Sequence, residues 1–337
     1  MRELQEKDIL FGAAYYPEYM PYDRLQEDIA MMQKAGMNTI RIAESTWSTL
    51  EPAEGVYDFS YIDKTLAAAE EAGMYVIIGT PTYAIPSWLE KKCPEVMVFD
   101  GYSRKKYGKR QIMDIVHPVF RKCAENVICK LLEHTANVSC VIGFQIDNET
   151  KHYGTASPQV QRMFVEYLKT KFHTTEQLNE VFGLRYWSNS ISDWSDFPDM
   201  AGCIHGGLAC EFAKFQRSLA AEYLVWQSEL VKKYKRQDQF ITHNFDFEWK
   251  KFGADIAQDG YSYGVQPDIN HYEASKAVTI AGTDIYHPTQ DGLTGAEIGF
   301  GGDSIRTLKD DAYIVLECQA QAFKYWTPYP GQLRLHG

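Results

Sequence analysis

The chain of 337 residues lacks the features that mark several large classes of protein. No apolar run approaches the ~18 residues needed to cross a membrane, and the first ten residues, MRELQEKDIL, are charged where a secretory signal would be apolar. The seven cysteines form no CxxC pair, and several lie in apolar surroundings typical of buried thiols. With 24 Gly and 13 Pro, the chain is neither collagen-like nor broadly disordered. We therefore expect a reduced, soluble, cytoplasmic protein with no membrane partner.

Positive charge is also scarce. The 34 Lys and Arg residues face 45 Asp and Glu residues, and the net charge of −11 argues against nucleic acid or an anionic membrane as the partner. The same charge favours a neutral ligand over a phosphorylated one. A glycine-rich phosphate loop is missing as well, because the segment after the first expected strand reads YYPEYMP (15–21).

What the sequence does have is a regular alternation of short apolar runs and amphipathic segments. Runs that are apolar throughout are typical of parallel strands buried on both faces, and we expect seven of them, at residues 9–16, 38–43, 75–80, 141–146, 240–245, 278–285 and 312–316. Helical spacing of apolar residues predicts helices at residues 24–35, 62–72, 119–135, 159–172 and 210–234. This order fits either a doubly wound sheet or a (β/α)₈ barrel.

Polar residues at the ends of the expected strands favour the barrel. The active sites of barrels are built at the C-terminal ends of several strands, and this chain has polar residues there repeatedly: Glu44, Asn148, Glu149, His243, Asn244, Asp284 and Glu317. We predict an α/β fold of the (β/α)₈ TIM-barrel type, with one catalytic domain over residues 1–337. A mostly helical stretch around residues 150–239 is expected as a long insertion, and the aromatic stripe of residues 210–234 as core.

Two carboxylates carry the chemical hypothesis. Glu149 ends QIDNE after the fourth expected strand, and Glu317 ends YIVLE after the seventh. Two carboxyl groups that face each other across a barrel mouth can hydrolyse a glycosidic bond, since one protonates the leaving oxygen while the other attacks the anomeric carbon or activates water. Taken singly, each glutamate is more often a strand cap or the partner of an arginine.

Several other polar and aromatic residues have two interpretations each. Trp47 and Trp88 follow strands and either face the pocket or pack in the core. Glu44 either contacts the ligand or pairs with Arg41. His243 and Asn244 end the fifth strand, where they are placed to line the pocket.

Long stretches of the chain resemble the catalytic barrel of the glycoside hydrolase family 42 β-galactosidases. The most specific signature is TPTxxxPxWL (80–89) followed by QxDNE (145–149), in this order and spacing. The other similar segments are residues 15–21, 35–63, 107–110 (YGKR), 283–288 (TDIYHP), 316–319 (LECQ) and 329–335. The resemblance covers nearly the whole chain.

The resemblance implies a function and a set of site residues. It implies a retaining β-galactosidase that needs no cofactor, with Glu149 as the general acid/base and Glu317 as the nucleophile, their carboxyl groups about 5–5.5 Å apart. It also implies that Arg110, Asn148, Tyr286 and Trp326 bind the sugar. The substrate would be a galactoside or oligosaccharide, and related sugars such as β-glucosides, β-fucosides and α-L-arabinopyranosides stay open alternatives. Relatives often form trimers, although their accessory domains contribute to that assembly.

The chain departs from the resemblance in two places. Many relatives hold a structural zinc with four cysteines, whereas the corresponding segments here, RQIMDIVHP and TKHYGTASP, contain none. We therefore expect no metal, because Met113 and Thr150 cannot replace thiolates. The resemblance ends inside the helix expected after the seventh strand, so we expect a barrel that is incomplete at its C-terminal end or closed in another way, without accessory domains. A sugar-binding barrel without turnover is the alternative from a different class.

Overall fold

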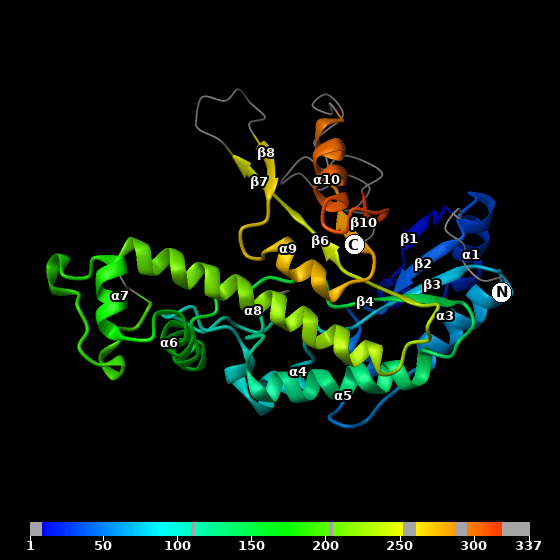
Figure 1. The fold of residues 1–337 in the computed structure, drawn as a ribbon. Helices are drawn as coiled ribbons and strands as arrows, with labels where there is room; N and C mark the ends of the chain where they lie inside the picture. Colours follow the sequence, from blue (N-terminus) through cyan, green and yellow to red (C-terminus); the bar gives the residue numbers. More distant parts are fainter. Residues whose placement is uncertain (1–8, 109–111, 202–204, 252–260, 287–294, 319–337) are drawn as a thin grey trace.

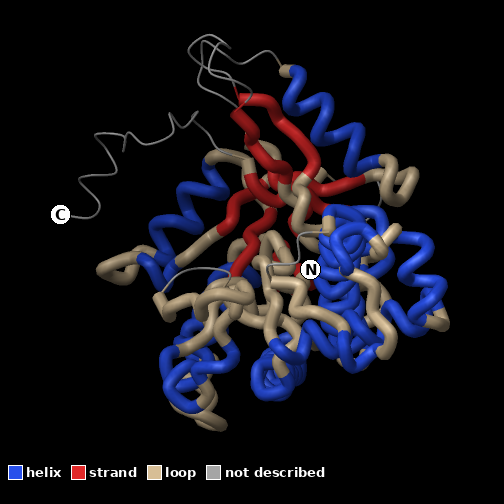
Figure 2. Tube along the Cα trace, turned by 90° about the vertical axis from the view of Figure 1, so that its left-hand side faces the viewer, coloured by secondary structure: helices blue, strands red, loops and turns tan. Residues whose placement is uncertain are grey.

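The computed structural model describes residues 9–108, 112–201, 205–251, 261–286 and 295–318. Strands lie at its centre and helices surround them (Figures 1 and 2). One parallel sheet runs in the order β1 (Gly12–Ala14), β2 (Thr39–Ile42), β3 (Tyr75–Gly79), β4 (Val141–Gln145) and β5 (Phe240–Thr242). The arc continues through β6 (Asn244–Phe245), β9 (Ala281–Asp284) and β10 (Tyr313–Glu317), again in parallel.

These elements form the predicted α/β barrel. All seven expected strand regions contain a strand, each close to its expected position. Within the described ranges, β1 and β10 are the two ends of the arc, and residues 12–14 and 314–316 line a common cavity between them. The fifth region is split into β5 and β6 at His243, a break that the apolar pattern does not signal.

Side-chain alternation along the strands separates the barrel interior from its outer layer. Inside, Tyr75, Ile77, Ile142 and Phe240 form one buried cluster, against which side chains from the neighbourhood of β1, β9 and β10 pack. The alternate residues, such as Val76 and Ile78, belong to the larger cluster shared with the helices. A layer filled by side chains from several strands is the packing typical of this barrel.

The helices cover the outside of the barrel and build the region between β4 and β5. The α-helices are α1 (Leu25–Lys34), α2 (Trp47–Leu50), α3 (Ser60–Glu71), α4 (Ser87–Lys92), α5 (Pro118–Thr135), α6 (Pro158–Phe172), α7 (Thr175–Phe182), α8 (Gly206–Lys232), α9 (His271–Ala274) and α10 (Ala296–Arg306). Short 3₁₀ helices occur at η1 (Pro17–Tyr19), η2 (Pro94–Val96), η3 (Tyr186–Ser188), η4 (Trp194–Asp196) and η5 (Ser275–Ala277). The five predicted helices correspond to α1, α3, α5, α6 and α8. Whether the whole chain is one domain stays a prediction.

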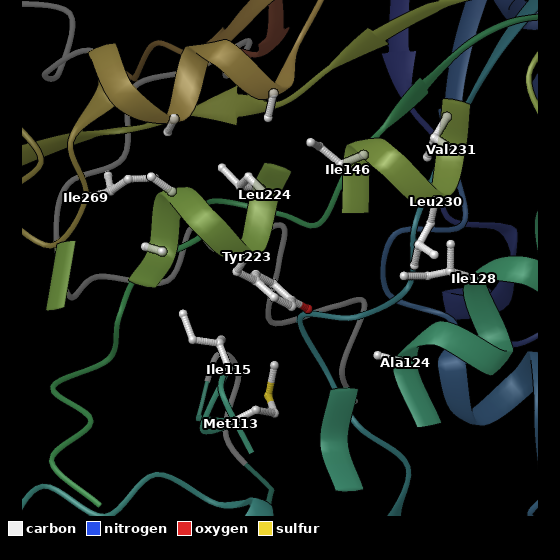
Figure 3. Close-up of a cluster of buried hydrophobic side chains, with 14 of the residues drawn as sticks. Met113, Ile115, Ala124, Ile128, Ile146, Tyr223, Leu224, Leu230, Val231 and Ile269 are labelled. Atoms are coloured by element: carbon white, nitrogen blue, oxygen red, sulfur yellow. The ribbon is translucent and has the colours of Figure 1, made fainter. Parts of the chain in front are cut away.

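The long helix α8 ties the region between β4 and β5 to the barrel. It runs lengthwise across the molecule from the neighbourhood of α7 toward α5 (Figure 1). Its Tyr223 and Leu224 are fully buried, and Figure 3 shows them in the same apolar cluster as Ile146, the residue that follows β4. The stripe predicted as core is therefore core, and it belongs to the same buried cluster as the residue that follows β4.

The strand pair after β6 has no counterpart in the sequence prediction, and neither do the helices α2, α4, α9 and α10. β7 (Phe247–Lys251) and β8 (Tyr261–Val265) pair antiparallel and project from the barrel beyond β6 (Figure 1). Residues 247–265 were not predicted as strands, because the prediction relied on uninterrupted apolar runs. Among the described residues, no helix combines the length and apolar character needed to span a membrane.

Candidate active site

Three carboxylates meet at the C-terminal ends of the barrel strands. Glu149 follows β4, Asp284 ends β9 and Glu317 ends β10. One oxygen from each lies within 4.8 Å of an oxygen of each of the others. The spacing between Glu149 and Glu317 is typical of retaining glycosidases, whereas inverting enzymes separate the two groups by about 6.5–9.5 Å to admit a water.

Arg41, in the middle of β2, binds Glu317 directly. Its Nη2 donates to Oε1 of Glu317 at 2.7 Å and to Oε1 of Glu44 at 3.1 Å, while Nη1 donates to Oε1 of Gln145 at 2.8 Å. Burial disfavours the charge on this guanidinium, but the carboxylates of Glu44 and Glu317 outweigh burial and raise the pKa of Arg41 well above its ordinary value. Arg41 therefore stays positive and favours the ionised form of Glu317.

A tyrosine hydroxyl holds the second oxygen of Glu317. Tyr286, two residues after β9, donates its hydroxyl proton to Oε2 of Glu317. Burial, followed by the negative charge of Glu317, raises the pKa of Tyr286 above its ordinary value. Tyr286 thus keeps its proton and remains a hydrogen-bond donor. Arg41 and Tyr286 together fix the orientation of the carboxylate.

Asp284 is the most deeply buried of the three acids. Burial raises its pKa well above the ordinary value, and the nearby charges of Glu317 and Glu149 act in the same direction. Asp284 therefore binds a proton more readily than an exposed aspartate does. Its Oδ2 accepts a hydrogen bond from Nδ2 of Asn244 at 2.7 Å.

Asn244 on β6 connects Asp284 to the turn that carries Glu149. Its Nδ2 also donates to Oδ1 of Asn148 at 2.9 Å, and its Oδ1 accepts from the backbone N–H of Glu149 at 3.0 Å. Nε2 of Gln145 donates to the same oxygen of Asn148 at 3.3 Å. These bonds fix the Asn148 amide beside Glu149, at the mouth of the barrel.

Four of the six predicted site residues are brought together in this way: Asn148, Glu149, Tyr286 and Glu317. The other two, Arg110 and Trp326, lie outside the described residues. Glu44 pairs with Arg41 through the contact described above, which is the simpler of its two predicted interpretations.

The two tryptophans also follow the simpler interpretation. Trp47 is fully buried, and its Nε1 donates to Oε2 of Glu51 at 2.8 Å. Trp88 donates to the carbonyl oxygen of Glu51 at 2.9 Å and packs against the large core cluster. Both side chains are therefore packing residues.

Sequence reasoning missed the roles of Arg41 and Asp284. An arginine inside the buried run NTIRIA was a usable signal, because a buried charge requires a partner. Asp284 was noted only as a polar strand end. Its raised pKa follows first from its burial and then from the two other acids nearby, and neither has a signature in the local sequence.

The part of the chain that the structure describes offers little to hold a metal. In the two segments where the resemblance implies zinc-binding cysteines, Met113 and Thr150 are buried, and Nε2 of His152 lies 3.3 Å from Oδ1 of Asp268, so a tetrahedral thiolate site does not fit. The cluster of Glu149, Asp284 and Glu317 also suits a cation poorly, because Arg41 already compensates Glu317 and burial disfavours the charged form of Asp284.

Comparisons with known proteins show which proteins the chain is similar to. The family model of glycoside hydrolase family 42, described as β-galactosidase, matches residues 14–336. The β-galactosidase BgaA of a Thermus species is 31% identical to this chain over 97% of the chain and 52% of that protein. A β-galactosidase of Thermus thermophilus is 30% identical with the same coverage of both chains.

Solved structures show the same fold. The crystal structure of a β-galactosidase from Rahnella sp. R3 superposes with a TM-score of 0.83 at 25% identity, over 97% of this chain and 47% of that chain. A β-galactosidase from the haloarchaeon Halorubrum lacusprofundi superposes with a TM-score of 0.81, over 97% of this chain and 50% of that chain. The chain spans about half the length of the curated relatives that it matches.

Proposed function

Because the chain belongs to glycoside hydrolase family 42, we propose that it is a retaining β-galactosidase that releases terminal β-D-galactose from a neutral galactoside or oligosaccharide. The observation that carries this proposal is the approach of Glu149 and Glu317 to within 4.8 Å at the mouth of the barrel. The gap between the two carboxyl groups is too narrow to admit the attacking water that an inverting enzyme needs. It suits direct attack by one carboxylate on the anomeric carbon.

In the first step, Glu317 attacks the anomeric carbon while Glu149 protonates the leaving oxygen. The bonds from Arg41 and Tyr286 keep Glu317 ionised and aimed at the sugar. The products of this step are the free alcohol and a galactosyl ester of Glu317. Once Glu317 is esterified, its negative charge is gone.

In the second step, Glu149 acts as the base. It removes a proton from water, and that water attacks the anomeric carbon and releases Glu317. Two inversions at the same carbon leave the configuration of galactose unchanged. We assign sugar-hydroxyl contacts to Asn148, Tyr286 and Arg110 and a wall of the sugar subsite to Trp326, following the family resemblance.

The proposal is tested with a panel of p-nitrophenyl glycosides: β-galactoside, β-glucoside, β-fucoside and α-L-arabinopyranoside. We expect the highest kcat/KM on the β-galactoside, and β-galactose as the first product in a time-resolved NMR spectrum. Glu317→Gln should abolish turnover, whereas Glu229→Gln, an exposed glutamate on α8, should leave it unchanged.

The outcomes separate the alternatives. A higher rate on another sugar assigns the related specificity, and α-galactose as the first product contradicts the retaining mechanism. Galactose binding without turnover by the native chain identifies a sugar-binding barrel. Assembly into a homo-oligomer and a cytoplasmic location stay predictions, and light scattering on the purified chain tests the first.

A further inference from the structure

The turn that carries Glu149 has a backbone conformation that its residues do not favour. Asp147 and Glu149 have φ values of 49° and 41°, in the left-handed region where residues other than glycine are strained. Such a turn persists only where its surroundings hold it. The groups that bond to the backbone between Ile146 and Thr150 therefore determine where Glu149 lies.

His243 contacts this turn on both sides. It lies between β5 and β6, its side chain is buried, and its Nδ1 lies 2.6 Å from the carbonyl oxygen of Ile146. The backbone N–H of Thr150 donates to Nε2 of the same ring at 3.3 Å. One imidazole thus bonds to the residue before Asp147 and to the residue after Glu149.

These two contacts determine the tautomer of His243. The N–H of Thr150 can only donate, so Nε2 must present a lone pair, and the proton must lie on Nδ1, where it is donated to Ile146. An imidazolium would turn a second N–H toward that of Thr150. Burial is the main cause that lowers the pKa of His243 to about 3; the bond to Ile146 opposes this shift, and His271 and Lys151 add to it.

We propose that His243 is a positioning residue for Glu149, and that it holds the acid/base turn as the neutral Nδ1–H tautomer through Ile146 and Thr150. The inference rests on the proposed role of Glu149. If the turn loses either bond, the strained backbone relaxes and the Glu149 carboxyl moves away from the leaving oxygen. Glu317 is held separately by Arg41 and Tyr286, so attack on the sugar stays intact.

Two substitutions each remove one of the two bonds. In His243→Asn the amide nitrogen replaces Nδ1 and keeps the bond to Ile146, and in His243→Gln the amide oxygen replaces Nε2 and keeps the bond to Thr150. The matched control is His271→Asn. His271 is also buried and also packs on Phe245, but it bonds to the backbone of Asp246 instead.

The expected result is a loss that depends on the leaving group. Methoxyphenol is a poor leaving group that needs protonation by the acid. For methoxyphenyl β-galactoside, kcat/KM should therefore fall about 10- to 100-fold in both His243 variants, because misplacing the general acid loses part of its contribution to the rate. For 2,4-dinitrophenyl β-galactoside, which leaves without a proton, kcat/KM should stay within about threefold of the native value. On that substrate kcat and KM should fall together, because the second step still needs Glu149 as base.

A purely structural role for His243 would give a different pattern. Equal losses of kcat/KM on both substrates, or the same leaving-group dependence in His271→Asn, would overturn the proposal.

A measurement on the native chain decides the tautomer even where a variant does not fold. Nitrogen NMR of the ¹⁵N-histidine-labelled protein at pH 7 should show His243, assigned by comparison with His243→Asn or His243→Gln, as the Nδ1–H form. An Nε2–H form or an imidazolium contradicts the inference. The NMR measurement needs no turnover. A native chain that is inactive on every galactoside would therefore refute the proposed function, while the NMR spectrum would still test the tautomer of His243.

Discussion

Arg41 and Glu317 are separated by 276 positions in the sequence, yet Nη2 of the arginine lies 2.7 Å from Oε1 of the glutamate. The arginine side chain is 3% exposed and the glutamate side chain 19%. A pair so well shielded from water is held by its geometry and by further hydrogen bonds, and removing one partner leaves an uncompensated charge.

Arg41→Met should therefore reduce both stability and activity. We expect a loss of about 3–5 kcal/mol in the free energy of unfolding, because Glu44 and Glu317 lose their shared cation. Urea denaturation measures this loss, and p-nitrophenyl galactoside hydrolysis measures activity. Arg24→Met is the control, since Arg24 pairs with Asp28 near the surface. A stability loss in Arg41→Met no larger than in the control would contradict the buried-pair argument.

Tyr286→Phe should lower turnover with little effect on the fold. The substitution removes one hydrogen-bond donor to Glu317 and keeps the ring, so we expect kcat to fall about 10- to 100-fold, because the carboxylate is held less accurately for attack. The control is Tyr19→Phe. The Tyr19 side chain is exposed and its hydroxyl donates to Ser45, so its loss should leave kcat unchanged. Equal kcat in the two variants would exclude a role for the Tyr286 hydroxyl.

Asp147 should make stability depend on pH. Burial raises its pKa to about 6 from the ordinary 3.8, so the native state binds this proton more tightly than the unfolded chain does. The stability contributed by the protonated form is complete below about pH 4 and is lost as the pH rises through 6, by ~3 kcal/mol. Asp147→Asn should remove this pH dependence.

The measurement is the difference in free energy of unfolding between the native chain and Asp147→Asn from pH 4 to pH 8. The control is Asp196→Asn, at an exposed carboxylate. A difference curve that is flat across this range would show that Asp147 titrates normally.

Gly79→Ala should displace Glu44 and so reduce both stability and activity. A Cβ at this position would lie 2.5 Å from Cβ and 2.8 Å from Cα of Glu44, so β2 or β3 must shift. We expect a loss of about 1–3 kcal/mol in stability, as for other overpacked cores, together with lower activity because Glu44 and Arg41 move. Gly206→Ala, where a Cβ meets nothing within 4 Å, is the control. A neutral Gly79→Ala would mean that the two strands separate without cost.

Leu224→Ala tests the support that α8 gives to the acid/base turn. Leu224 is fully buried in the cluster that contains Ile146, and we expect a loss of about 2–5 kcal/mol from the cavity. Val225→Ala on the exposed side of the same helix should cost less than about 0.5 kcal/mol. Thermal denaturation of both variants measures the contrast, and similar melting temperatures would contradict it.

The prediction from sequence succeeded where the signal is local. The uninterrupted apolar runs that contain Val76 and Ile142 predict strands buried on both faces, and β3 and β4 lie there. The helical spacing of apolar residues in 210–234 predicts α8. It failed where pairing between distant segments decides the structure. The break of the fifth strand at His243 and the antiparallel pair β7–β8 depend on hydrogen bonds that no apolar pattern encodes.

By itself, the sequence determined the order of strands and helices, the barrel class, the family resemblance and the positions of Glu149 and Glu317 at strand ends. Only the tertiary structure decided that Arg41 binds Glu317, that burial raises the pKa of Asp284 and that His243 is a neutral tautomer. The physical reason is that charge compensation, burial and hydrogen-bond direction depend on distances between groups far apart in the chain. Those distances exist only once the strands have assembled side by side in the barrel.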